Sequence, residues 1–228
     1  FELTVYPHML RMQTQLGNFR VVFQDKRTLT FGLPSHVTAG LRFHVSPQFW
    51  EENQHGGAFK AVRNLTYATD GETVVNKITP HEGGYYVEFI VQRQKDCDIS
   101  LQVHENTTPP FQVLPFSIAR EAAESRWHEW FSNVPTVDEK YRPTYAYAWW
   151  TMANNLISPQ GKVAYEAMTP SKINYVGLWL WDSAMHALAY RHLDPELARN
   201  QIRAMLTCQL ADGMLPDAVY DEGVVSTI

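Results

Sequence analysis

The chain has 228 residues and a mass of 26.2 kDa, and 45% of its residues are hydrophobic. These values allow a buried core and two modest domains, and they exclude a disordered chain and a small disulfide scaffold. The formal net charge of -5 gives no general attraction to polyphosphate or to an anionic membrane surface. We therefore expect neither a nucleic-acid partner nor a membrane partner.

The two cysteines, Cys97 and Cys208, lie far apart and in no CxxC or Cys/His spacing. This pattern favours two free thiols in a reducing compartment, and we expect no metal and no cofactor. The first residues have neither the basic start nor the apolar middle of a signal peptide. That favours a cytoplasmic protein.

Residues 1–115 are predicted to form an antiparallel β-sandwich domain. Apolar and polar residues alternate from Ile99 to His104, and several β-branched and aromatic runs are separated by glycine-containing turns. Asp70-Gly71 predicts a hairpin that joins Val62–Thr69 to Thr73–Ile78. Many short strands punctuated in this way are typical of a sandwich.

The hydrophobic period then changes from that of strands to that of helices. Ser117 to Phe131 predicts a linker helix between two domains, and we place the linker at 116–140. Thr144 to Ile157 predicts a second, mostly buried helix that ends before Ser158-Pro159.

Two further helices are predicted after an irregular segment. Leu178 to His192 has one apolar stripe, formed by Leu178, Trp181, Met185, Leu188 and His192. Asp194-Pro195-Glu196 is a strong helix start, with an N-cap aspartate, a first-turn proline and a carboxylate near the positive helix end. That helix is expected to run to about Leu210.

Aromatic residues and one carboxylate gather at the start of the third helix, at Tyr175, Trp179, Trp181 and Asp182. A sugar ring stacks on an indole face and its hydroxyls bind carboxylate acceptors, so this combination is typical of sugar recognition. The alternative is a buried aromatic cluster in which Asp182 only favours the helix start.

A second polar segment begins at Gln209, where four carboxylates follow within the loop that ends the fourth helix. They are Asp212, Asp217, Asp221 and Glu222. The loop could line a polar pocket or bind a cation, although its spacing is not that of an EF-hand. A solvated acidic loop is the alternative.

Histidine does not add a metal or catalytic signature. His186 and His192 have no partner at HExxH-type spacing and favour core or capping roles. The sequence also contains no GxSxG, no Walker phosphate loop and no GxGxxG, so serine-hydrolase and nucleotide-binding functions lose their main support.

The ordered series of motifs in the C-terminal half resembles the first part of the catalytic domain of glycoside hydrolase family 63. It is most similar to the bacterial α-glucosidase and mannosylglycerate-hydrolase-like members. The matching runs are MTPSK (168–172), YVGLWLWDS (175–183), HALAYRH (186–192), DPELA (194–198) and GMLPD (213–217), with Gln209 and DEG (221–223).

This resemblance implies an (α/α)6 barrel and the hydrolysis of an α-glycosidic bond with inversion. It implies that Trp181 and Asp182 bind the sugar that is cleaved off, with Tyr175, Trp179 and Gln209 nearby. Asp212, from the acidic loop, completes the candidate substrate-binding set. The family's general acid and base belong to motifs that do not occur in these residues, so both are expected beyond Ile228.

We therefore expect a truncated chain: a β-sandwich, a linker helix, and the first helices of an (α/α)6 barrel over 141–228. It would supply part of the sugar subsite of an inverting glycoside hydrolase that acts on a small glucoside or related sugar, and it would be inactive alone. Exposed barrel faces predict association with the missing remainder or with itself. A non-catalytic carbohydrate-binding or scaffold protein is the alternative.

Overall fold

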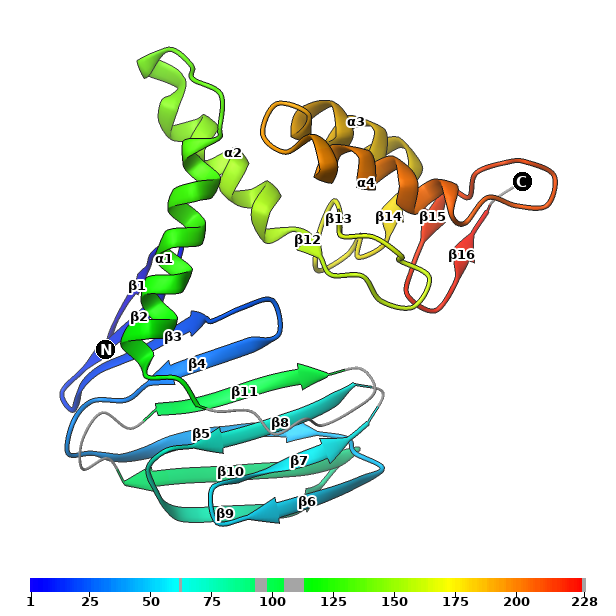
Figure 1. Ribbon diagram of the computed structural model, residues 1–228. Helices are drawn as coiled ribbons and strands as arrows, with labels where there is room; N and C mark the ends of the chain where they lie inside the picture. The colour runs from blue at the N-terminus through cyan, green and yellow to red at the C-terminus, as the bar shows by residue number, and fades with distance from the viewer. Residues whose placement is uncertain (62, 93–97, 105–112, 227–228) are drawn as a thin grey trace. The chain divides into compact units, whose positions relative to one another are not determined.

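The computed structural model describes residues 1–61, 63–92, 98–104 and 113–226 (Figure 1). The chain separates into two compact units, Phe1–Trp127 and His128–Ile228, and each is described by itself. Cys97 lies outside the described residues, and Cys208 is a free thiol.

The described strands of the N-terminal unit form two antiparallel sheets (Figure 1). The larger sheet has the order β1-β2-β3-β4-β11-β8-β7-β6 and the smaller has the order β5-β10-β9. The strands are β1 (Glu2–Val5), β2 (Leu10–Thr14), β3 (Gly17–Phe23), β4 (Thr28–Gly32), β5 (Thr38–Val45), β6 (Phe49–Asn53), β7 (Gly56–Lys60), β8 (Asn64–Thr69), β9 (Glu72–His81), β10 (Gly84–Gln92) and β11 (Asp98–His104).

Aromatic side chains from both sheets meet in the core between them. The Tyr67 ring of the larger sheet lies 5.6 Å from Phe43 and 4.9 Å from Phe89, which belong to the smaller sheet. Tyr67 and Phe89 are fully buried. The two sheets therefore pack face to face, and the predicted antiparallel β-sandwich is present in this unit.

The predicted hairpin around Asp70-Gly71 is wrong. β8 pairs with β7 and β11, whereas β9 pairs with β10 in the other sheet. The side chain of Asp70 accepts a hydrogen bond of 2.8 Å from the Asp98 N–H, which ties the turn to β11. A turn signal fixes a change of chain direction, but the pairing partner depends on which strands complete each sheet.

The hydroxyl of Tyr67 predicts a pH dependence of stability. Burial raises the pKa of Tyr67 to about 12, and its hydroxyl donates a hydrogen bond to Asn76 Oδ1. Because the folded pKa lies above the unfolded value, this stabilisation is complete below pH 10 and is lost as the pH rises to 12. The free energy of unfolding in urea should fall as the pH rises from 10 to 12. Tyr67→Phe should make this fall smaller. Equal slopes in both proteins would contradict it.

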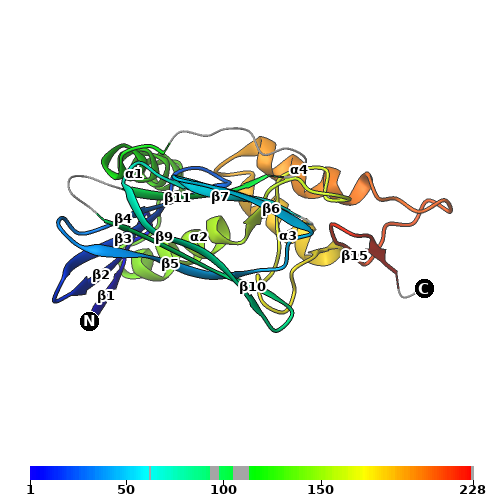
Figure 2. The same ribbon diagram turned by 90° about the horizontal axis from the view of Figure 1, so that it is seen from below.

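Helix α1 (Phe116–Ser132) begins against the larger sheet of the N-terminal unit (Figure 2). The Phe116 N–H donates a hydrogen bond of 2.7 Å to Asp98 Oδ2, and Arg20 lies 4.5 Å from the centre of the Phe116 ring. Phe116 packs with the buried Val22, Ala119 and Ala123. The helix predicted from Ser117 to Phe131 is therefore present.

The C-terminal unit combines helices with short two-residue strands. Its helices α3 and α4 lie side by side in Figure 1. The elements are the 3-10 helix η1 (Glu139–Tyr141), α2 (Arg142–Asn154), β12 (Leu156–Ile157), β13 (Ala167–Met168), β14 (Leu178–Trp179), α3 (Leu180–Tyr190), α4 (Pro195–Leu206), β15 (Ala218–Val219) and β16 (Val224–Val225).

The prediction that the second helix is mostly buried is wrong. In α2 only Trp149 is buried, and it packs against Tyr145, Trp130 and Tyr190. Tyr147, on another side of the helix, is exposed and stacks on Trp150. The aromatic residues surround the helix, so only the side that meets α1 residues and α3 is covered within this unit.

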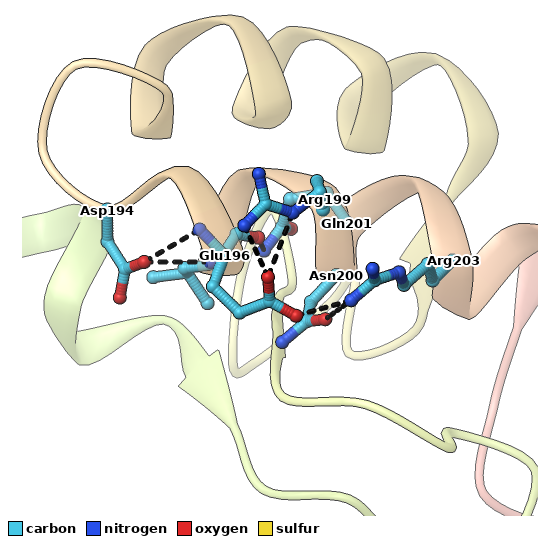
Figure 3. A network of polar contacts seen from close by, with 7 residues as sticks. Asp194, Glu196, Arg199, Asn200, Gln201 and Arg203 are labelled. Carbon is cyan, nitrogen blue, oxygen red and sulfur yellow. Dashed lines mark hydrogen bonds and ion pairs between the residues drawn. The ribbon is translucent and has the colours of Figure 1, made fainter.

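The predicted start of α4 is confirmed. The side chain of Asp194 accepts hydrogen bonds of 2.9 Å from the Glu196 N–H and 3.0 Å from the Leu197 N–H (Figure 3). Glu196 in turn pairs with Arg199 at 2.5 Å and with Arg203 on the exposed side of the helix. The helix ends at Leu206, before the predicted Leu210.

The third helix begins at Leu180 and not at the predicted Leu178, which is fully buried in β14. The other apolar residues of the predicted stripe that lie in α3 face outward. Trp181 is 73% exposed, and Met185 and Leu188 are exposed as well. The side that packs inward carries Ser183 and Tyr190, which are both buried.

The four described helices do not show the (α/α)6 barrel, which remains a prediction. Among the described residues, no helix is both long and apolar enough to cross a bilayer.

Candidate functional site

The candidate site begins where strand β14 becomes helix α3. β14 pairs with β15, and the Leu180 N–H donates a hydrogen bond of 2.9 Å to the Asp217 carbonyl. Trp179 is the N-cap residue and has an extended backbone, with φ -94 and ψ 136. These contacts place Trp181 and Asp182 in the first turn of α3, where the helix dipole favours a carboxylate.

Two of the predicted aromatic residues contact each other. The rings of Tyr175 and Trp179 lie 5.5 Å apart with an angle of 68° between their planes. Tyr175 is exposed and Trp179 is half-buried. Gly177, between them, lies so close to Tyr220 that a Cβ would stand 2.7 Å from that ring. The segment therefore presents an edge-to-face aromatic pair at the surface.

Trp181 offers an open indole face, because it is the most exposed of the predicted tryptophans. Asp182 beside it is partly exposed and is free of any salt bridge to the described residues. An exposed indole next to an unpaired carboxylate can stack on a sugar ring and accept hydrogen bonds from its hydroxyls. The alternative of a buried aromatic cluster therefore does not describe Trp181.

Gln209 and Asp212 use their polar groups within their own loop. Gln209 Nε2 donates a hydrogen bond of 2.6 Å to the Gly213 carbonyl, and Asp212 Oδ1 accepts one of 3.0 Å from the Met214 N–H. Gly213 has φ 90, a conformation that suits glycine. Both side chains are exposed. In the described residues, no hydrogen bond joins them to Asp182 or to the aromatic pair.

The acidic loop is ordered by backbone contacts to an earlier segment. Asp221 accepts hydrogen bonds from the Lys162 N–H at 2.9 Å and from the Gln160 side chain. Gly161 has φ 52, and a Cβ there would lie 2.1 Å from the Asp221 carbonyl oxygen. The described residues contain no group of three or more His, Cys, Asp or Glu side chains that could hold a metal ion. The contacts of Asp221 pack the loop against residues 160–162.

Two buried polar residues near the site were not predicted from the sequence. Gln201 of α4 and Ser183 of α3 are fully buried, and the Oγ of Ser183 has no hydrogen-bond partner among the described residues. Burial lowers the pKa of His186, opposed by the charge of Asp182 and by a hydrogen bond to the Met168 backbone. The core or capping role of His186 stays a prediction. A glutamine in an amphipathic helix carries no sequence signal of burial.

Comparison with known families bears on this C-terminal segment. Residues 175–227 match the mannosylglycerate hydrolase MGH1-like glycoside hydrolase domain. The match covers all six predicted sugar-binding residues, Tyr175, Trp179, Trp181, Asp182, Gln209 and Asp212. The sequence-based resemblance to a glycoside hydrolase is thereby supported, whereas membership of family 63 remains part of the proposal below.

The fold resembles that of a solved glycoside hydrolase. A family GH92 inverting mannosidase from Bacteroides thetaiotaomicron aligns over 97% of this chain with a TM-score of 0.55 and 13% sequence identity. The chain spans 37% of the length of that mannosidase. At this identity the similarity concerns the fold alone.

Proposed function

We propose that this chain forms part of an inverting glycoside hydrolase of the family 63 type, which acts on an α-glycosidic bond of a small glucoside or related sugar. Trp181 and Asp182 bind the sugar that is released, and Tyr175 and Trp179 line the same subsite. The observation that carries the proposal is the exposed indole of Trp181 beside Asp182, inside the segment that matches a glycoside hydrolase domain.

Asp182 acts in this proposal as a hydrogen-bond acceptor for sugar hydroxyls. Inverting hydrolysis needs a carboxylic acid and a second carboxylate roughly 6.5–9.5 Å apart. We assign neither role to Asp182 and place both catalytic groups outside these residues, in the remainder of an (α/α)6 barrel. Met185 and Leu188, which are exposed on α3, mark the face on which we expect barrel helices or a second copy to pack.

A non-catalytic carbohydrate-binding or scaffold protein is the second candidate. The exposed Trp181 indole and the Asp182 carboxylate favour it, because such groups can bind a sugar without any proton transfer. Turnover separates the two functions. The complete protein should hydrolyse a 4-nitrophenyl α-glycoside and release the β-anomer, which NMR detects, whereas a binding protein would bind the glycoside without releasing nitrophenol.

Tryptophan fluorescence tests sugar binding directly. Titration of the complete protein with methyl α-glucoside or methyl α-mannoside should give a saturable change, because a sugar that stacks on Trp181 changes the environment of its indole. Trp181→Ala should remove most of this change and weaken binding at least tenfold. Trp150→Phe is the control, since Trp150 stacks on Tyr147 in α2. Saturating sugar that leaves the wild-type fluorescence unchanged would contradict the subsite.

A further inference from the structure

Strand β13 is held by buried side chains from both neighbouring helices. Gln201 Oε1 of α4 accepts a hydrogen bond of 2.9 Å from the Met168 N–H, and Gln201 Nε2 donates one of 3.1 Å to the Leu197 carbonyl. Figure 3 shows Gln201 on α4, and its bond to Leu197 spans one turn of that helix. Both polar groups of this buried amide are therefore bound to backbone.

Helix α3 contacts the same methionine. The Tyr190 hydroxyl lies 2.9 Å from the Met152 carbonyl oxygen and 3.4 Å from Met168 Sδ. β13 pairs with β12 along one edge, which leaves its other edge to these side chains. The position of Met168 is thus fixed from α2, α3 and α4 together.

The segment after Met168 leads directly to the candidate sugar subsite. The Thr169 N–H donates to the Asn155 carbonyl at 3.0 Å, and Asn155 Nδ2 donates to the Pro170 carbonyl at 3.2 Å. The Ser171 N–H then donates to the Tyr175 carbonyl at 3.2 Å. This chain of hydrogen bonds runs from the buried strand to the residue whose ring contacts Trp179.

The energetics indicate a geometric role for Gln201. A buried amide costs free energy unless its groups are paired, and a leucine of similar size would pack between helices without that cost. The specific contribution of Gln201 is the hydrogen bond that it accepts from the Met168 N–H. This directed bond fixes the position of β13 relative to α4. A loop held at Met168 can keep Tyr175 in place before sugar binds, which lowers the entropy lost on binding.

We propose that Gln201 is a positioning residue of the sugar subsite: by fixing Met168 it sets the loop 169–175, and so holds the Tyr175 ring against Trp179. The inference rests on the proposed function for its link to sugar. Its structural part, the effect of Gln201 on the Tyr175–Trp179 pair, does not depend on sugar.

The test compares Gln201→Leu with Asp194→Ala in the complete protein. Asp194→Ala removes the cap of the same helix and destabilises it without touching Met168, so it controls for lost stability. The protein carries 5-fluorotryptophan, and the Trp179 signal is assigned with Trp179→Phe. Gln201→Leu should shift or broaden the Trp179 fluorine signal and weaken methyl α-glucoside binding about tenfold. Asp194→Ala should leave the signal in place and change affinity less than twofold.

Gln201→Glu gives an independent readout. A protonated glutamic acid retains one acceptor and one donor, so it can bind both Met168 and Leu197, whereas the ionised form cannot donate to Leu197. Burial disfavours ionisation. Sugar affinity of this variant should therefore be close to wild type at low pH and fall as the pH rises, while the wild type lacks this step.

Three results decide the proposal. An unmoved Trp179 signal in Gln201→Leu overturns it, whether or not sugar binds. A shifted signal with unchanged sugar affinity overturns the link to the subsite. A shifted signal in a protein whose wild type binds no methyl α-glucoside or methyl α-mannoside supports the positioning of Tyr175 and contradicts the proposed function instead.

Discussion

Replacing Asp182 with alanine in the complete protein is expected to lower kcat/KM by about 100- to 10,000-fold. Two hydrogen bonds from sugar hydroxyls to a carboxylate are worth about 1.5–3 kcal/mol each, and every 1.4 kcal/mol corresponds to about tenfold in rate. The measurement is steady-state hydrolysis of a 4-nitrophenyl α-glycoside. Loss of the part of these bonds already made in the ground state should raise KM, and loss of the part that strengthens in the transition state should lower kcat.

The fold should survive this substitution. Asp182 caps no backbone group by a hydrogen bond and contributes through the helix dipole, so its loss costs about 0.3–1 kcal/mol of stability. Asp138→Ala is the matched control, since Asp138 is an exposed N-cap carboxylate of η1 with no side-chain cap hydrogen bond. Wild-type kinetics in Asp182→Ala would refute the assignment of this residue to the sugar subsite.

Tyr67→Ala is expected to destabilise the N-terminal sandwich by about 3–5 kcal/mol, the usual range for removing a buried aromatic ring. The ring is fully buried and contacts Phe43, Phe59 and Phe89 from both sheets. Its hydroxyl also donates a hydrogen bond of 2.7 Å to Asn76 Oδ1. Loss of the Tyr67 ring leaves a cavity, and loss of its hydroxyl leaves Asn76 Oδ1 without this hydrogen bond. Urea unfolding, followed by circular dichroism in the β-sheet region, measures the change in midpoint.

The control for Tyr67 is Trp50→Ala. Trp50 is larger, but it lies on the edge strand β6, is partly exposed and contacts the Tyr85 ring at 4.6 Å. Its removal should cost much less, because the site is already open to water. Equal unfolding midpoints for the two variants would show that the core does not depend on Tyr67.

Features set by nearby residues could be predicted from the sequence. The start of α4 depends on Asp194, Pro195 and Glu196, whose contacts span at most a few residues along the chain. The third helix was predicted from its periodicity, but its start was not, because Leu178 and Trp179 pair with the distant strand β15 instead of beginning the helix. The β-sandwich followed from strand alternation and turns. For α4 and the strands the determining interactions are local, so the pattern carries them.

Features set by distant residues could not be predicted. The Asp70-Gly71 turn has the same sequence whether β9 pairs with β8 or, as found, with β10. The exposed side of α3 has a regular apolar stripe, yet its inward side carries Ser183 and Tyr190. Both outcomes depend on which elements lie alongside, and this information is spread over the whole chain.

Short motifs were sufficient to predict the glycoside hydrolase resemblance and the residue types of the candidate subsite. Which of those residues meet depends on how the elements pack. The tertiary structure joined Tyr175 to Trp179 and opened Trp181 to solvent, while it tied Gln209 and Asp212 into their own turn. It also revealed Gln201, since burial and the backbone group that pairs with a side chain arise from packing between helices, which leaves no local trace.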